Sequence, residues 1–281
     1  MSFLHDDLIE RVKRISGVPS GIDDRDFRNY INQEMVNVTV PLIQTTDISY
    51  LSKYVDVAIT SEGYRIPRRS IGATIHEVAK VEGGNYTKLC QVERTGHEGR
   101  LGGYYLERNK VFFVNVTGTV RIWYTDSPSK LVSTDRCALI TSLSSSPVGI
   151  NVSGVPANIT ASIDLDVVQG VPSFDVLAQN VQSTIIVGNS IRFAAQPSSE
   201  AAAGDYVCPA GEAPLLTIPE AAQDFALHGA ALRLMRLQQL PGINEVKEEY
   251  LMLRQNLISL LGGRVKKDHA YLRVSDDFFV R

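Results

Sequence analysis

Residues 217–263 read TIPEAAQDFALHGAALRLMRLQQLPGINEVKEEYLMLRQNLISLLGG, and this stretch predicts two long helices joined by a sharp turn. Thr217 and Glu220 fit a capping box, and Pro219 lies in the first turn, where its missing N–H costs nothing. The first helix carries small residues on one face, which allows another helix to approach closely. We expect this face to pack within the chain, with a contact between subunits as the alternative.

The second helix of this stretch begins after the break at residues 240–242, where Asn244 can cap it, and it ends at Gly262 and Gly263. Its apolar residues recur at alternating spacings of four and three, which is typical of a seam that contacts another helix. The seam consists of Val246, Tyr250, Leu253, Leu257 and Leu260.

The N-terminal part predicts two further helices. Apolar residues repeat at helical spacing over residues 4–15, until the break at residues 17–19. A second helix starts at Asp23 or Asp24, which are candidate N-caps, and Pro41 ends it. The two helices should form a small hairpin.

Between about residue 50 and residue 215 the pattern changes to short β-type stretches separated by turn residues. Residues 107–110 and the pair Gly188-Asn189 predict tight hairpin turns. The Ser- and Gly-rich stretch 142–154 predicts a linker, which separates a first β segment (49–143) from a second (144–214), and residues 197–205 predict a mobile loop. The chain is therefore expected to be an α+β protein with a large, mainly antiparallel β region between its helices.

Composition and charge limit the possible functions. The chain has 281 residues, of which 44% are apolar, so a sizeable core is available. Its 28 basic and 31 acidic residues give a net charge of −3, which argues against a basic groove that wraps nucleic acid. Three cysteines without a C-x-x-C pair predict neither a disulfide framework nor a zinc site. No apolar stretch suits a signal peptide or a membrane span, so we expect synthesis in the cytoplasm and no membrane contact.

A search for catalytic groups finds none that converge. Cys90 and His97 are close in sequence, but no helix start is placed to lower the pKa of the thiol. The glycines of residues 96–103 continue into a strand rather than into a phosphate-binding helix, and His76-Glu77 lacks a second histidine. Asp23, Asp24 and Asp26 are better explained as a helix start than as a cation site. The sequence therefore predicts no enzyme, no metal and no cofactor.

Two short basic stretches, residues 65–69 and 264–267, are the best candidates for contacts with nucleic acid. Both lack the aromatic residues that stack on bases, so we expect solvated faces or partner contacts rather than sequence-specific recognition of DNA.

Taken in order, four stretches of the chain resemble the head-to-tail connector, or adaptor, proteins of tailed bacteriophages. These stretches are DFRNYINQEMVNVTVPLI (26–43), YYLERNKVFFVNVTGTVRIWYTDSPSKLV (104–132), GDYVCPAGEAPLLTIPEAAQDFALHGAALRLMRL (204–237) and GGRVKKDHAYLRVSD (262–276). Their order is more specific than any one of them.

The resemblance implies a discontinuous helical core made from residues 1–48 and 215–268, with the β region inserted. It also implies a structural protein of the virion: a dodecameric adaptor ring at the head–tail interface, which joins the portal protein to tail or nozzle proteins and lets genomic DNA pass through its channel. A C-terminal arm, residues 269–281, would bind the portal through Tyr271, Leu272, Arg273, Phe278 and Phe279. The β region is longer than a minimal connector needs, and it would dock tail components or decorate the ring.

Closed rings use two different faces of one subunit. The seam residues Val246, Tyr250, Leu253 and Leu257, together with the small-residue face, are candidates for these subunit contacts. A stopper or tail-terminator protein, which binds the tail rather than the portal, is the alternative in the same class. A β-rich adhesion or carbohydrate-binding module is the alternative from another class, suggested by Tyr104, Tyr105 and Trp123.

Overall fold

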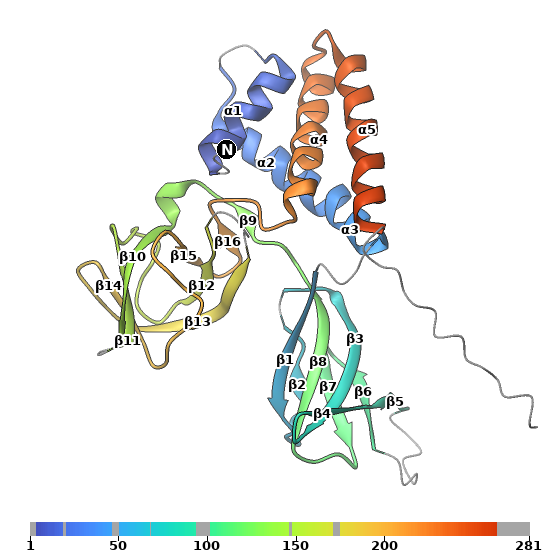
Figure 1. The fold of residues 1–281 in the computed structure, drawn as a ribbon, viewed down its shortest axis with the longest axis vertical. Helices are drawn as coiled ribbons and strands as arrows, with labels where there is room; N and C mark the ends of the chain where they lie inside the picture. Colours follow the sequence, from blue (N-terminus) through green and yellow to red (C-terminus); the bar gives the residue numbers. More distant parts are fainter. Residues whose placement is uncertain are drawn as a thin grey trace, which may run out of the picture.

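The helices at the two ends of the chain lie together, and the strands form two separate modules below them (Figure 1). The computed structural model describes residues 4–18, 21–46, 51–67, 69–93, 102–145, 148–170 and 175–262. Helices and strands occupy different parts of the molecule, so the chain is an α+β protein.

The helical core joins α1 (His5–Ser16), α2 (Asp24–Glu34), α3 (Val40–Thr46), α4 (Glu220–Gln238) and α5 (Ile243–Gly262). The Asp23 side chain caps α2 by accepting from the N–H of Arg25, as predicted. The predicted stop at Pro41 is wrong. A π-helix over Met35–Thr39 connects α2 to α3, and Val40 N–H reaches back to Met35 O. Its wider turn accommodates the ring of Pro41, so one helical rod continues to Thr46.

Two predicted caps at the C-terminal helices are also wrong. The Thr217 hydroxyl does not cap α4; it accepts from the N–H of Ser129, 2.7 Å away. Asn244 lies inside α5, which begins one residue earlier. At α4 the predicted cap residue is used in a tertiary contact with Ser129, which local sequence patterns do not encode. At α5 the helix begins at Ile243, directly after the predicted break, so the difference is one residue.

The first β module is a sandwich of two four-stranded sheets, in the orders β1-β8-β3-β4 and β2-β7-β6-β5. Its core lies between the sheets and includes Val78, Val111, Val120 and Ile122. The predicted hairpin at residues 107–110 is confirmed by the pairing of Glu107 with Lys110. The strands are β1 (Ser52–Ala58), β2 (Tyr64–Arg65), β3 (Ser70–Glu82), β4 (Asn85–Lys88), β5 (Cys90–Gln91), β6 (Gly103–Glu107), β7 (Lys110–Val114) and β8 (Thr119–Asp126).

The second β module is a closed barrel in the order β10-β11-β14-β13-β12-β15. The predicted turn at Gly188-Asn189 is confirmed, because Val187 pairs with Ser190. The strands are β10 (Ala138–Ser145), β11 (Val148–Val152), β12 (Asp164–Val168), β13 (Val176–Val187), β14 (Ser190–Phe193) and β15 (Tyr206–Pro209). Between the modules and the helices, β9 (Lys130–Leu131) pairs in parallel with β16 (Glu212–Ala213).

The predicted linker at residues 142–154 is wrong, because residues 142–145 belong to β10 and residues 148–152 form β11, and the two pair as neighbouring barrel strands. The boundary drawn at residues 143 and 144 therefore falls inside β10. The serines suit β10 because much of this strand faces solvent. The expected mobile loop at 197–205 instead packs on the barrel, where the Asp205 carboxylate accepts from the N–H groups of Gly170 and Ala202.

Candidate partner-binding surfaces

The small-residue face of α4 packs against other helices of the same chain. Ala222, Ala226 and Ala230 are fully buried in the helical core against α1, α2 and α5. A Cβ atom at Gly229 would lie 2.2 Å from Oε1 of Glu34, so only glycine leaves room for that carboxylate. The face therefore serves packing inside one subunit.

Glu34 is a buried acid at the centre of this packing. Its Oε1 accepts from the Tyr250 hydroxyl at 3.1 Å, and its Oε2 accepts from Nε of Arg233 at 3.0 Å. Burial raises the pKa of Glu34, against the opposing effects of Tyr250 and Arg233. Burial, followed by the nearby Glu34 charge, also raises the pKa of Tyr250. The cluster joins α2, α4 and α5.

The α5 seam, whose residues were predicted to lie at the subunit interface, makes contacts inside the chain. Tyr250 stacks on Phe225 of α4 with ring centroids 4.6 Å apart, and Leu253 and Leu257 pack against the helical core. Val246 is half-buried. A heptad-like seam does not specify whether the partner helix belongs to the same chain, and here it is α4.

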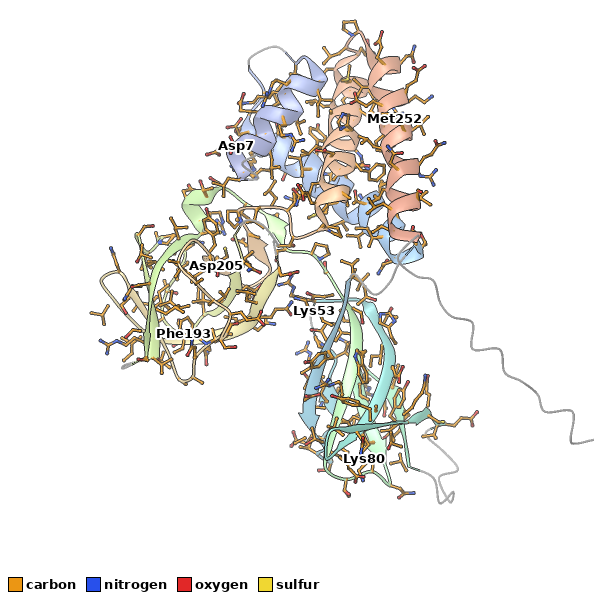
Figure 2. All side chains as sticks on the ribbon, viewed as in Figure 1. Asp7, Lys53, Lys80, Phe193, Asp205 and Met252 are labelled. Carbon is orange, nitrogen blue, oxygen red and sulfur yellow. The ribbon has the colours of Figure 1, made fainter. Side chains whose placement is uncertain are left out.

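Other faces of α5 carry exposed apolar side chains. Leu251 and Ile258 lie two helical turns apart on one flank, 44% and 37% exposed. Met252, on the outer side of α5 in Figure 2, and Leu260 are also exposed. The shared exposure of Leu251 and Ile258 on one flank is the feature expected of a surface that contacts a partner.

The proposed portal-binding arm lies outside the described residues. This holds for Tyr271, Leu272, Arg273, Phe278 and Phe279, and also for the basic stretch 264–267.

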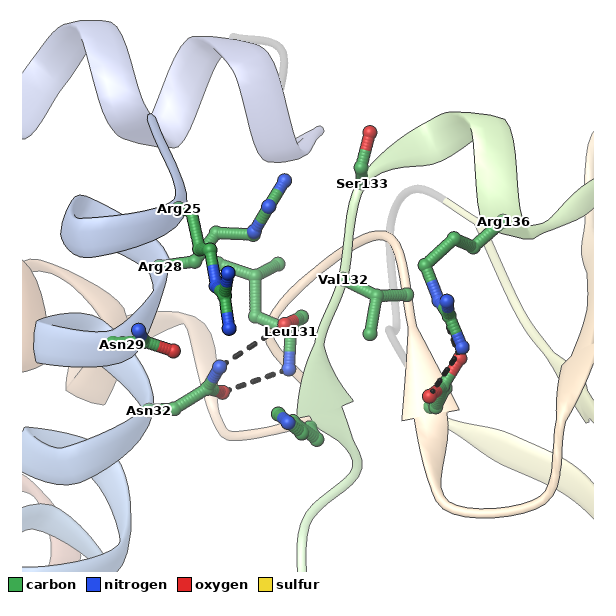
Figure 3. Close-up of a pocket in the computed structure, with 10 residues that line it drawn as sticks. Arg25, Arg28, Asn29, Asn32, Leu131, Val132, Ser133 and Arg136 are labelled. Carbon is green, nitrogen blue, oxygen red and sulfur yellow. Dashed lines mark hydrogen bonds and ion pairs between the residues drawn. The ribbon is translucent and has the colours of Figure 1, made fainter. Parts of the chain in front are cut away.

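A cationic pocket of about 290 Å³ lies between α2, β9 and the short 3₁₀ turn Thr134–Arg136 (Figure 3). Asn32 forms its inner wall, because its side chain both donates to Leu131 O and accepts from Leu131 N–H. Sequence reasoning missed this pocket, since its basic residues are scattered over the chain. They are Arg25, Arg28, Lys130 and Arg136.

A second hollow of about 340 Å³ continues from the first along the same helical rod. The two share Asn32 and Lys130. Met35, Val36 and Pro128 give the second hollow a mainly apolar lining, although Arg69 and Lys130 also border it. Together the two hollows form what we call the α2–β9 groove, cationic at one end and mainly apolar at the other.

An aromatic patch lies on the sheet that contains β1, β4 and β8. Trp123 contacts Tyr54 and Tyr86, with ring centroids 6.4 Å and 6.0 Å away, and both tyrosines are exposed. The Arg121 guanidinium lies 3.7 Å from the Tyr54 ring centroid and pairs with Asp56. Of the two other aromatics singled out by sequence, Tyr104 is buried and Tyr105 stacks on Phe112.

Arg69 joins the two β modules. Its Nη1 donates to Asp166 of the barrel at 2.5 Å, and its Nη2 donates to Ser127 O and Ser129 Oγ. Lys53 of the sandwich, labelled between the modules in Figure 2, donates to Val176 O of the barrel. The stretch 65–69 was expected to be solvated or to contact a partner, yet Arg69 is used inside the fold.

The three cysteines, which were considered as reactive or metal-binding groups, all lie among the described residues. Cys90 is exposed and Cys137 and Cys208 are buried, all as free thiols, while His97 lies outside the described residues. Burial raises the pKa of Cys208. Within the described ranges there is no cluster of three metal-binding side chains, and no helix there is long and apolar enough to cross a membrane.

Comparison with known proteins gives this chain no family. No protein-family model matches it, and no curated protein matches it at a significant level.

Proposed function

We propose that this chain is a non-enzymatic structural subunit that assembles into a ring, as the head-to-tail connectors of tailed bacteriophages do. The observation that carries the proposal is the apolar surface of α5. This helix covers the bundle with one face and leaves Leu251, Met252 and Ile258 exposed on others. A neighbouring copy is the occupant we assign to this surface, because a ring closes by repeating one contact between two different faces.

In this proposal the ring joins the portal to tail or nozzle proteins, needs no cofactor and lets DNA pass without reading its sequence. The subunit is made in the host cytoplasm and acts in the virion at the head–tail interface, most simply as a dodecamer. The net charge of −3 agrees with a protein that does not trap DNA by neutralising its phosphates. The two β modules, held together by Arg69, would lie on the ring as docking sites for tail components.

Mass photometry of the full chain, alone and with a cognate portal ring, tests the proposal. The double variant Leu251→Glu, Ile258→Glu should abolish ring formation while circular dichroism and thermal unfolding show an intact fold. The matched control is Ile185→Glu, Val187→Glu on the barrel, where the side chains are 49% and 54% exposed, and it should leave the ring intact. A chain that stays monomeric with and without portal would overturn the proposal.

Replacing the arm from Tyr271 onward should abolish portal binding and leave the fold unchanged. Binding to isolated tails but not to the portal would instead favour a stopper or tail-terminator protein.

The aromatic patch favours a second candidate, a carbohydrate-binding module. Exposed Tyr54 and Tyr86 beside Trp123 offer ring faces on which a sugar can stack. Against this, the Arg121 guanidinium already covers part of those faces. Glycan-array binding that Tyr54→Ala, Tyr86→Ala removes would support the candidate, and an array without signal would exclude it.

A further inference from the structure

The α2–β9 groove has two ends of different chemistry on one side of a single helical rod. Arg25, Arg28, Asn32 and Val36 follow one another at spacings of three and four residues, so they lie on one helix face. Arg25 and Arg28 line the cationic end, and Val36 lines the apolar end. From Val36 to Arg28 the rod rises by roughly 12 Å, and to Arg25 by roughly 16 Å.

Positive charge dominates the cationic end. Arg136 pairs there with Glu212, the one acidic residue among those that line the pocket. Arg28 Nη1 donates to His5 Nε2 at 3.1 Å, and among the described residues no carboxylate forms an ion pair with Arg28. In the part of the chain that the structure describes, Arg25 and Lys130 have no ion-pair partner. The groove therefore suits a segment that carries a carboxylate next to apolar side chains.

The chain contains such a segment. Residues 271–277 read YLRVSDD. In an extended conformation Leu272, Val274 and Asp276 would lie on one face, with Arg273 on the other. Leu272 and Asp276 would then be roughly 13 Å apart, which matches the separation of Val36 from the two arginines. The segment thus carries apolar and acidic side chains at the spacing that separates the apolar end of the groove from its cationic end.

The order of the residues in the segment and the length of chain that connects it to α5 both agree with binding within one molecule. Gly262, the last residue of α5, lies beside Thr46, because a Cβ atom there would be 3.9 Å from Thr46 Cγ2. A chain that leaves this point and follows the rod backward meets the apolar end first, roughly 15 Å away at Val36, and the cationic end afterwards. Its apolar residues also precede its acidic ones. The ten residues from Gly262 to Leu272 can span up to roughly 33 Å.

We propose that the α2–β9 groove binds residues 271–277 of its own chain, with Leu272 and Val274 at the apolar end and Asp276 between Arg25, Arg28, Lys130 and Arg136. Tyr271 and Leu272 are also portal anchors in the proposed function, so the arm cannot occupy both places at once. While the arm is bound in the groove of its own chain, it would not be available to the portal until the portal competes for it. The groove and the segment belong to one chain, so this inference does not depend on the ring or on the portal.

Disulfide trapping in the full chain tests the inference. Cys90, the exposed thiol, is first replaced by serine, and cysteines are introduced as Asn29→Cys in the groove and Val274→Cys on the face of the segment that would point into the groove. The matched control pairs Val274→Cys with Gln255→Cys, an exposed position on α5 only seven residues before Gly262. Non-reducing gels and mass spectrometry then report the rate of disulfide formation and whether the bond joins one chain or two.

We expect a disulfide within one chain that forms about tenfold faster in the Asn29→Cys protein than in the Gln255→Cys protein, despite the longer tether. Charge reversal by Arg25→Glu, Arg28→Glu should remove this advantage, and adding Asp276→Arg, Asp277→Arg should restore it. Equal rates in the two proteins would overturn the inference. A bond that joins two chains would also overturn it, because the occupant would then be a second copy.

Discussion

Glu34 occupies the space that any side chain at position 229 would need. The acid, Tyr250 and Arg233 come from three different helices and meet in the core through two hydrogen bonds to one carboxylate. Such a polar contact fixes the register of helices whose remaining contacts are apolar and less specific. It also places a titratable group where water cannot fully solvate its charge.

The first prediction concerns the stability of the fold as pH rises. The pKa of Glu34 is raised by burial above its ordinary value of 4.5, so the folded state binds this proton more readily than the unfolded state. The contribution to stability is present below pH 4.5 and is lost as pH rises through the folded pKa. Glu34→Gln removes this loss, so its stability relative to the wild type should increase from pH 4.5 to neutral pH. Urea unfolding of both proteins at the two pH values measures the difference.

The pKa of Tyr250 is raised further above neutral pH, so this hydroxyl keeps its proton at both pH values. A stability difference that does not change with pH would therefore contradict this account. Glu34→Ala provides the control. It leaves Tyr250 and Arg233 without their acceptor, so it should be less stable than Glu34→Gln at both pH values.

The sequence predicts the positions of helices and turns better than it predicts which elements pack against one another. Helix positions, the Asp23 cap and both tight turns follow from local periodicity and turn chemistry. The prediction that the helix ends at Pro41 was wrong because a π-helix, which has no simple sequence signal, precedes the proline and lets the helix continue. The α5 seam was recognisable, but its partner was not, since Phe225 and Leu257 read the same whether they meet within a chain or across two. The α2–β9 groove was not foreseeable, because Arg25 and Arg136 come together only through the fold.

The second prediction concerns the attachment of β9 to the helical rod. Asn32 is buried and makes two hydrogen bonds to the backbone of Leu131. Asn32→Ala leaves that buried N–H and C=O without partners, which should lower the free energy of unfolding by about 2 kcal/mol. Asn29→Ala, one turn earlier on the same groove but exposed, should change it by less than about 0.5 kcal/mol. Equal losses in the two variants, measured by urea unfolding, would show that the amide does not anchor the strand.

At the scale of the whole molecule, a buried charge connects the modules. Asp166 of the barrel is fully buried and accepts from the backbone N–H groups of Asn180 and Gly211 as well as from Arg69. Burial raises its pKa, against the opposing effects of these N–H groups and of the Arg69 charge. Arg69 also lies 3.4 Å from Asp126 of the sandwich, which accepts from Gln179 of the barrel. One guanidinium thus compensates acids from both modules.

The third prediction follows from this arrangement. Arg69→Met removes the charge that compensates Asp166 and should destabilise the protein by about 3–5 kcal/mol. Arg121→Met is the matched control, because it breaks an ion pair with the exposed Asp56 and leaves no buried carboxylate uncompensated, so it should destabilise the protein less than Arg69→Met does. Thermal unfolding compares the two. If the loss comes from an unpaired buried carboxylate, adding Asp166→Asn to Arg69→Met should recover much of the stability, since the amide carries no charge. A double variant as unstable as Arg69→Met alone would mean that the arginine acts through its contacts with Ser127 and Ser129 instead.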